Sequence, residues 1–191
     1  MSPKGAIECF LCHSTGALVE GSLRVEQLVP GIQCQRCHEK SDAHAASFQS
    51  NGTKIIPPRL GSQTAEESLE FCGQCHRTWS QIAANGPHNA TNVRFQPYRL
   101  TNSKCYDTAD ARIRCTTCHD AHTEAPQPAA FYDAKCQACH STQGKAGERL
   151  CKVGKADCAG CHMPKVALRE THTKFTDHWI RIARPGDPTP P

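Results

Sequence analysis

One five-residue unit, Cys-x-x-Cys-His, occurs six times in this chain of 191 residues and constrains its fold more than any other feature. The copies begin at Cys9, Cys34, Cys72, Cys115, Cys136 and Cys158. They use 12 of the 14 cysteines. The composition predicts roughly 0.06 such matches by chance, so the repeat is not accidental.

The spacing of this unit suits covalent attachment of haem c. Two thiols separated by two residues can reach the two vinyl groups on one porphyrin edge, and the next residue places its imidazole on the iron. The predicted thioether residues are Cys9, Cys12, Cys34, Cys37, Cys72, Cys75, Cys115, Cys118, Cys136, Cys139, Cys158 and Cys161. The predicted proximal iron ligands are His13, His38, His76, His119, His140 and His162. The sequence therefore predicts six haem c cofactors.

Other uses of paired cysteines explain the repeat less well. The pairs Cys115/Cys118 and Cys136/Cys139 have a separation that would fit a zinc ribbon. Iron–sulfur ligation and a dense disulfide scaffold also use many cysteines. None of these alternatives requires a histidine after every pair, so we favour haem.

Five histidines lie outside the repeats and are candidates for the distal faces of the irons. They are His44, His88, His122, His172 and His178. His44 is expected on a short helix, and a helical turn would place His122 on the same side as His119. The carboxylate of Asp177 could orient a nearby imidazole.

Five spare histidines leave one of six irons without a distal imidazole. That iron could be five-coordinate and catalytic, or it could bind Met163, Met1 or the N-terminal amine. Alternatively, the missing histidine lies in sequence upstream of Met1. The residues alone leave these three explanations open.

Two cysteines, Cys105 and Cys151, belong to no repeat. In an oxidising compartment we expect a disulfide between them rather than two unpaired thiols. The bridge would close a loop of about 47 residues and stabilise the chain by roughly 3–4 kcal/mol in the chain-entropy model.

The fold is expected to be mainly α with little regular secondary structure, rich in loops, and built on a core of stacked haems. Large apolar residues are sparse, and about 32 residues serve each haem, so the haems must shield one another. A capping box at Thr64 predicts a helix that runs to about Trp79, and a second helix is expected over 131–141. No strong strand pattern is present. We expect one hexahaem domain over 1–191, in which lobes 1–100 and 101–180 are conceivable, and an extended proline-rich tail over 181–191.

Several segments resemble those of bacterial multihaem cytochromes c related to the hydroxylamine-oxidoreductase and multihaem nitrite-reductase superfamily. These segments are residues 29–34 (VPGIQC), 95–100 (FQPYRL), 118–122 (CHDAH), 161–165 (CHMPK) and 176–178 (TDH). The resemblance implies stacked and T-shaped haem pairs with mostly bis-histidine iron, and it supports His122 and His178 as distal ligands. It also implies sequence before the first repeat, which favours the third explanation for the missing ligand. A Cys-x-x-Cys-Lys unit, the nitrite-reductase signature, is absent, and we identify no hydroxylamine-oxidoreductase crosslink.

The predicted function is electron transfer through closely packed haems rather than enzyme catalysis. The alternative is an oxidoreductase that acts on a small nitrogen, sulfur or peroxide species at one open iron. Haem propionates would turn the chain's formal +4 into about −2 when oxidised and about −8 when reduced, so nucleic-acid binding is not expected. Expected partners are other redox proteins or further copies of the chain, in a filament or as a subunit of a membrane complex.

The expected location is periplasmic or extracellular, because haem c is attached after export. No apolar run is long enough to span a bilayer. The numbering also shows no signal peptide, so it begins either at a mature N-terminus or inside a longer precursor.

Overall fold

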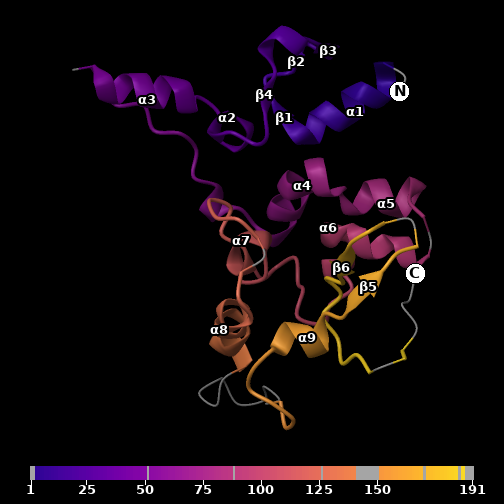
Figure 1. Cartoon of the computed structure of the whole chain (residues 1–191). Coiled ribbons are helices and arrows are strands. Elements are labelled where there is room, and N and C mark those ends of the chain that lie inside the picture. Colours follow the sequence, from indigo (N-terminus) through magenta and orange to yellow (C-terminus); the bar gives the residue numbers. More distant parts are fainter. Residues whose placement is uncertain are drawn as a thin grey trace. The chain divides into compact units, whose positions relative to one another are not determined.

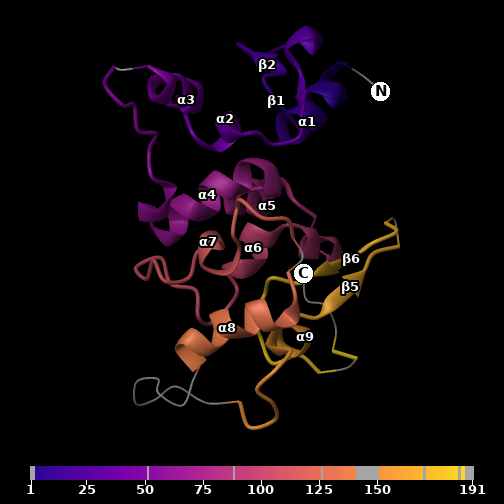
Figure 2. The ribbon, with the colours of Figure 1, turned by 60° about the vertical axis from the view of Figure 1, so that its left-hand side comes forward.

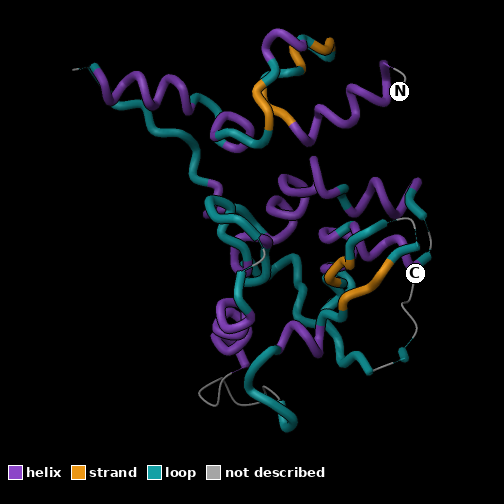
Figure 3. Tube along the Cα trace, in the orientation of Figure 1, coloured by secondary structure: helices purple, strands orange, loops and turns teal. Residues whose placement is uncertain are grey.

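The structure, a computed structural model, describes residues 3–50, 52–87, 89–125, 127–140, 151–169, 171–184 and 186–187. It divides into two compact units, Met1–Ser62 and Gln63–Pro191, and each is described by itself (Figure 1). Helices joined by long loops dominate the described chain, and the strands are short (Figure 3). This architecture is compatible with the mainly helical, loop-rich fold expected from the sequence. The single hexahaem domain and its lobes stay a prediction.

The unit Met1–Ser62 combines helices with two small antiparallel pairs of strands. Its elements are α1 (Pro3–His13), β1 (Ser14–Thr15), β2 (Leu18–Val19), β3 (Ser22–Leu23), η1 (Val25–Gln27), β4 (Val29–Pro30), α2 (Cys34–Cys37), α3 (Ser41–Gln49) and η2 (Leu60–Ser62). Strand β1 pairs with β4, and β2 pairs with β3. Gly16 connects the two pairs with a φ of 76°, and a Cβ there would lie 2.9 Å from the Gln27 carbonyl oxygen. Only glycine suits both the positive φ and this close approach.

The unit Gln63–Pro191 contains most of the helices and one β-hairpin. Its elements are α4 (Ala65–His76), α5 (Trp79–Asn85), η3 (Ala90–Arg94), α6 (Gln96–Leu100), α7 (Cys115–Cys118), α8 (Ala129–His140), α9 (Cys158–His162), β5 (Lys165–Ala167) and β6 (Lys174–Thr176). The hairpin pairs β5 with β6 in antiparallel register, with Val166 opposite Phe175. The tail expected to be extended over 181–191 falls partly outside the described residues, at 185 and 188–191.

Helix α4 begins at the capping box read from the sequence. The Thr64 hydroxyl accepts from the Glu67 amide at 3.1 Å, and the Glu67 carboxylate accepts from the Thr64 amide at 2.8 Å. The helix ends at His76 rather than at Trp79, because Arg77 has a φ of 63° and leaves the helical region. A second capping box at Thr78 then starts α5. This early end makes His76, the last residue of a repeat, the last residue of the helix.

Replacing Thr64 by alanine should lower the free energy of unfolding of the haem-loaded protein by about 1 kcal/mol, because the Glu67 amide loses its acceptor. Urea denaturation followed by circular dichroism measures this change. Thr108→Ala is the matched control, since Thr108 is exposed and outside every helix. Equal losses in the two variants would show that the cap contributes nothing particular to α4.

The apolar core is very small. Among the described residues, the buried apolar side chains are Ala17, Ala65, Leu69, Ile82 and Val93, and two of these five are alanines. Several large apolar side chains are exposed instead, including Val25 and Ile56. A chain of this length ordinarily buries most of such side chains, so its side chains alone do not account for its core.

Candidate haem sites

All six repeats are helical, in two forms. Helices α1, α4 and α8 end in the histidine of a repeat, whereas α2, α7 and α9 are short helices formed by a repeat itself. Residues three and four apart on a helix lie on one face. Each repeat therefore presents its two thiols on one side of a helical turn, with the imidazole following directly.

The thiols of the repeats remain accessible. Cys9, Cys34 and Cys161 are exposed, and the other nine cysteines of the repeats are half-buried. Among the described residues, no group of three or more histidine, cysteine or acidic side chains gathers around a point where one metal ion could bind.

The repeats of the larger unit follow one another in space in chain order. The Cys115 thiol of α7 forms a hydrogen bond with Cys72 of α4, which lowers the Cys115 pKa to about 7. Burial, followed by the charges of Cys136 on α8 and Cys105, raises the pKa of the Cys118 thiol to about 11. Figures 1 and 2 both show α4, α7, α8 and α9 in succession, and each of these helices contacts the next.

Asp133 joins the last two repeats. Its carboxylate, on α8, accepts from the backbone amides of Asp157 and Cys158 at 2.8 Å each, at the start of α9. These hydrogen bonds lower the Asp133 pKa. Asp133 thus satisfies amides at the α9 N-terminus that would otherwise lack acceptors.

In the smaller unit a hydrogen bond joins the first two repeats. Arg36 of α2 donates to the Leu11 carbonyl of α1 at 2.6 Å.

Four imidazoles have their Nδ1 atom engaged by an oxygen. His44 Nδ1 lies 2.5 Å from the Ile55 carbonyl, His162 Nδ1 2.9 Å from the Arg181 carbonyl, and His178 Nδ1 3.0 Å from the Thr176 carbonyl. His76 Nδ1 lies 3.1 Å from the Gln96 amide oxygen. These oxygens can only accept, so Nδ1 carries the proton and the Nε2 lone pair is left for a metal. A metal-binding histidine usually donates its other ring N–H to an oxygen in this way, which fixes the orientation of the ring.

The rings of two histidines far apart in the sequence lie close together. The ring centroids of His119 and His178 are 6.1 Å apart, and the ring planes differ by 28°. Imidazoles bound to opposite faces of one iron have centroids about 6 Å apart, because each metal–nitrogen bond is about 2 Å long. Burial, together with the neighbouring His119 and His76, lowers the His178 pKa to about 4. Of the described histidine pairs, this one has the spacing of an axial pair.

The other distal candidates are distributed along the chain. His44 lies on α3, as expected. The segment from His119 to His122 is not helical, so the predicted shared face is wrong: His119 caps α7 in extended conformation, and a turn follows. The His122 side chain is 80% exposed, with Nδ1 3.5 Å from Asp120. His172 is exposed between β5 and β6, and His88 lies outside the described residues.

The two cysteines outside the repeats are not bridged in the structure. Cys105 is half-buried, and burial raises its pKa above the ordinary value. Its neighbours include Cys136 and Cys139 of α8. Cys151 is exposed. The disulfide between them stays a prediction.

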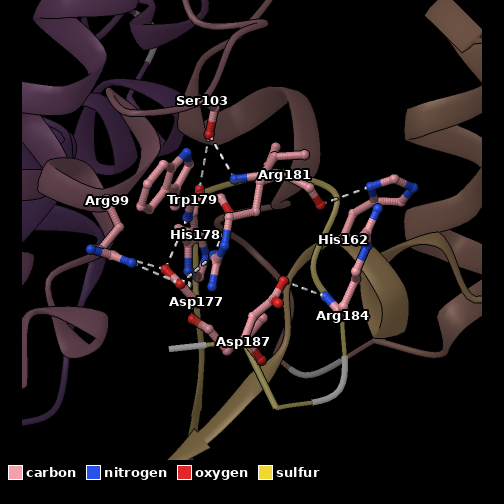
Figure 4. A network of polar contacts seen from close by, with 11 residues as sticks. Arg99, Ser103, His162, Asp177, His178, Trp179, Arg181, Arg184 and Asp187 are labelled. Carbon is pink, nitrogen blue, oxygen red and sulfur yellow. Dashed lines mark hydrogen bonds and ion pairs between the residues drawn. The ribbon is translucent and has the colours of Figure 1, made fainter. Parts of the chain in front are cut away.

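The Asp177 carboxylate binds two guanidinium groups directly rather than an imidazole. Both oxygens of this fully buried carboxylate bind the fully buried Arg99, at 2.8 Å each, and one oxygen also accepts from Arg181 at 2.6 Å (Figure 4). Burial opposes ionisation of Asp177, but the hydrogen bonds from Arg99, the Trp179 amide and Arg181 outweigh it and hold the pKa below its ordinary value. The sequence reasoning missed Arg99, whose only sign was its place in the segment 95–100.

Comparison with known proteins gives one distant relationship. The chain is 24% identical over 185 residues to the multiheme cytochrome MtrA of Shewanella baltica (strain OS185), across 89% of this chain and 49% of that protein. The chain thus spans about half the length of the relative. No family model matches the chain, and no solved structure is significantly similar to it. The relationship supports a multihaem c-type cytochrome family and therefore haem c and electron transport.

Proposed function

We propose that this protein transfers electrons through six haem c groups attached at its six repeats. The observation that carries the proposal is the succession of α4, α7, α8 and α9, whose repeats adjoin in chain order. Haems attached there would lie in file, so each electron transfer would span a short distance. Haem iron supplies the one-electron chemistry, and the protein sets its position, axial ligands and insulation from solvent.

The residues present fit the cofactor. Each repeat offers two thiols on one helical face, and several imidazoles have Nδ1 engaged so that Nε2 is left for iron. The small apolar core leaves room for large aromatic groups. Asn92 is fully buried, yet neither Nδ2 nor Oδ1 of its side chain has a hydrogen-bond partner within the described chain. Buried amides are ordinarily satisfied, so Asn92 is consistent with a polar group, such as a haem propionate, beside it.

In this proposal the twelve cysteines of the repeats form the thioether bonds, and the following histidines are the proximal ligands. The distal ligands are His44, His88, His122, His172 and His178. The spacing of 6.1 Å supports His119 and His178 as the axial pair of the fourth haem. One of the six irons has no distal histidine among these five, and the three explanations for it given under the sequence analysis remain open.

The biological setting follows from the same chemistry. Haem c attachment places the protein in the periplasm or outside the cell, with other redox proteins or further copies of itself as partners, in a filament or a membrane complex. No helix among the described residues is long and apolar enough to cross a membrane. In this oxidising setting Cys105 and Cys151 form a disulfide. The resemblance to the hydroxylamine-oxidoreductase and nitrite-reductase superfamily belongs to this proposal as well.

The exported, mature protein should carry six haems and exchange electrons reversibly. Intact-mass spectrometry and the pyridine haemochromogen assay count the haems, and a potentiometric titration followed in the Soret band tests reversibility. Fewer than six haems, or absorbance that does not return on reoxidation, would contradict the proposal. A high-spin ferric signal that shifts on addition of hydroxylamine or peroxide would instead support the enzyme alternative.

A further inference from the structure

The segment that carries His178 is held by side chains rather than by regular secondary structure. It follows directly on β6, and residues 177–180 lie in no helix or strand. The Ser103 hydroxyl donates to the His178 carbonyl at 3.2 Å and accepts from the Ile180 amide at 2.8 Å. The Arg181 amide donates to the His162 carbonyl at 3.1 Å. Figure 4 shows Ser103, Arg99 and His162 around this segment.

Arg99 and Arg181 hold the residues on either side of His178. Asp177 binds both guanidinium groups, and the carbon centres of these groups lie 5.1 and 4.9 Å from the Trp179 ring centroid. The Trp179 amide also donates to Asp177 Oδ1 at 3.0 Å, so the same carboxylate binds both arginines and the backbone just after His178. The His178 ring, between these two anchored residues, lies with its centroid 6.1 Å from that of His119.

Stability alone does not account for this ion pair. The Arg99 and Asp177 side chains are both 0% exposed, and a buried ion pair of this kind often adds no net stability over apolar residues of equal size. Its bidentate geometry does, however, fix the orientation of both partners. Arg99 comes from α6, 78 residues before Asp177, so the pair ties the His178 segment to a helix.

We propose that Arg99 and Asp177 are positioning residues that keep His178 on the iron carried by His119. The inference rests on the proposed function and deepens it. Without the ion pair, Asp177 and Trp179 lose their shared contact with the Arg99 guanidinium. The His178 ring then occupies the axial position in only a fraction of the molecules. That iron then becomes high-spin while its thioether bonds remain.

The test compares spin states in the purified, haem-loaded protein. His178→Ala should remove up to one sixth of the low-spin ferric intensity in EPR and optical spectra, and added imidazole should restore it. Arg99→Gln and Asp177→Asn should lose part of the same one-sixth, again restored by imidazole. Arg99→Lys, which keeps the charge but not the planar fork, should lie between Arg99→Gln and the wild type. Arg112→Gln is the matched control, since it removes the exposed ion pair with Asp110 and should leave the low-spin intensity equal to that of the wild type.

A purely electrostatic role gives a different result. Arg99→Gln and Asp177→Asn change the local charge in opposite directions, so they would shift one haem potential in opposite directions while the low-spin intensity stays that of the wild type. That outcome would overturn the inference. If Arg99→Gln does not accumulate, Ser103→Ala decides the question, because it loosens the same segment without leaving a buried charge unpaired. An unchanged Ser103→Ala spectrum would then refute positioning.

Failure of this inference is distinguishable from failure of the proposed function. If His178→Ala leaves the low-spin intensity of the wild type unchanged, His178 is not an axial ligand and the inference falls, while a six-haem electron carrier stands. If the mass shows fewer than six haems in the wild-type protein, the proposed function itself falls.

Discussion

Replacing Cys115 and Cys118 by alanine is expected to remove one of six haems and to interrupt the file of haems in its interior. Helix α7 lies between α4 and α8 in the succession of repeats. Removing the haem attached to α7 should therefore leave one long electron-transfer step in place of two short ones. We expect the Soret absorbance to fall by about one sixth and electron transfer through a protein film to slow on the order of tenfold or more. Protein-film voltammetry measures the rate, and intact mass confirms that five haems remain.

The matched control removes the repeat at the end of the file. Cys158→Ala with Cys161→Ala also costs one haem, but α9 stands at the end of the succession, after α8. Soret circular dichroism separates the two variants, because an interior haem couples to two neighbours and a terminal haem to one. Equal loss of coupling and equal slowing in the two variants would contradict the proposed order.

The chain without haem is expected to lack a cooperatively folded state. The five apolar side chains that are buried among the described residues include two alanines, so burial of apolar side chains stabilises this part of the chain only weakly. Ordering the backbone opposes folding by roughly 1–2 kcal/mol per residue. We therefore expect the haems of the proposed function to supply the stabilisation that these side chains do not.

Differential scanning calorimetry tests this expectation on protein made without haem attachment. The haem-loaded protein should show a sharp thermal transition and the haem-free chain none, with most of its helical circular dichroism lost. A variant with all twelve cysteines of the repeats changed to alanine, exported in the same way, separates loss of haem from loss of export. A haem-free chain that melts with an enthalpy similar to that of the loaded protein would show that the side chains suffice.

Features that depend on a few consecutive residues could be read from the sequence. The capping box needs only Thr64 and Glu67, so the start of α4 was predicted correctly. His44 was likewise placed on a helix from its local context. The end of α4 was missed because it depends on the positive φ of Arg77, which no propensity for arginine predicts.

The six haem sites were predicted from the sequence by itself, because thioether attachment and proximal ligation use five residues in a row. The partners of those sites were decided only by the tertiary structure. The facing of His119 and His178, the contact of Cys72 with Cys115 and the pairing of Arg99 with Asp177 all join distant segments. Such contacts follow from how helices and loops pack, so a count of spare histidines could not assign them. The repeat thus predicts how many haems the chain holds, and the packing indicates which residues would complete the coordination of one of them.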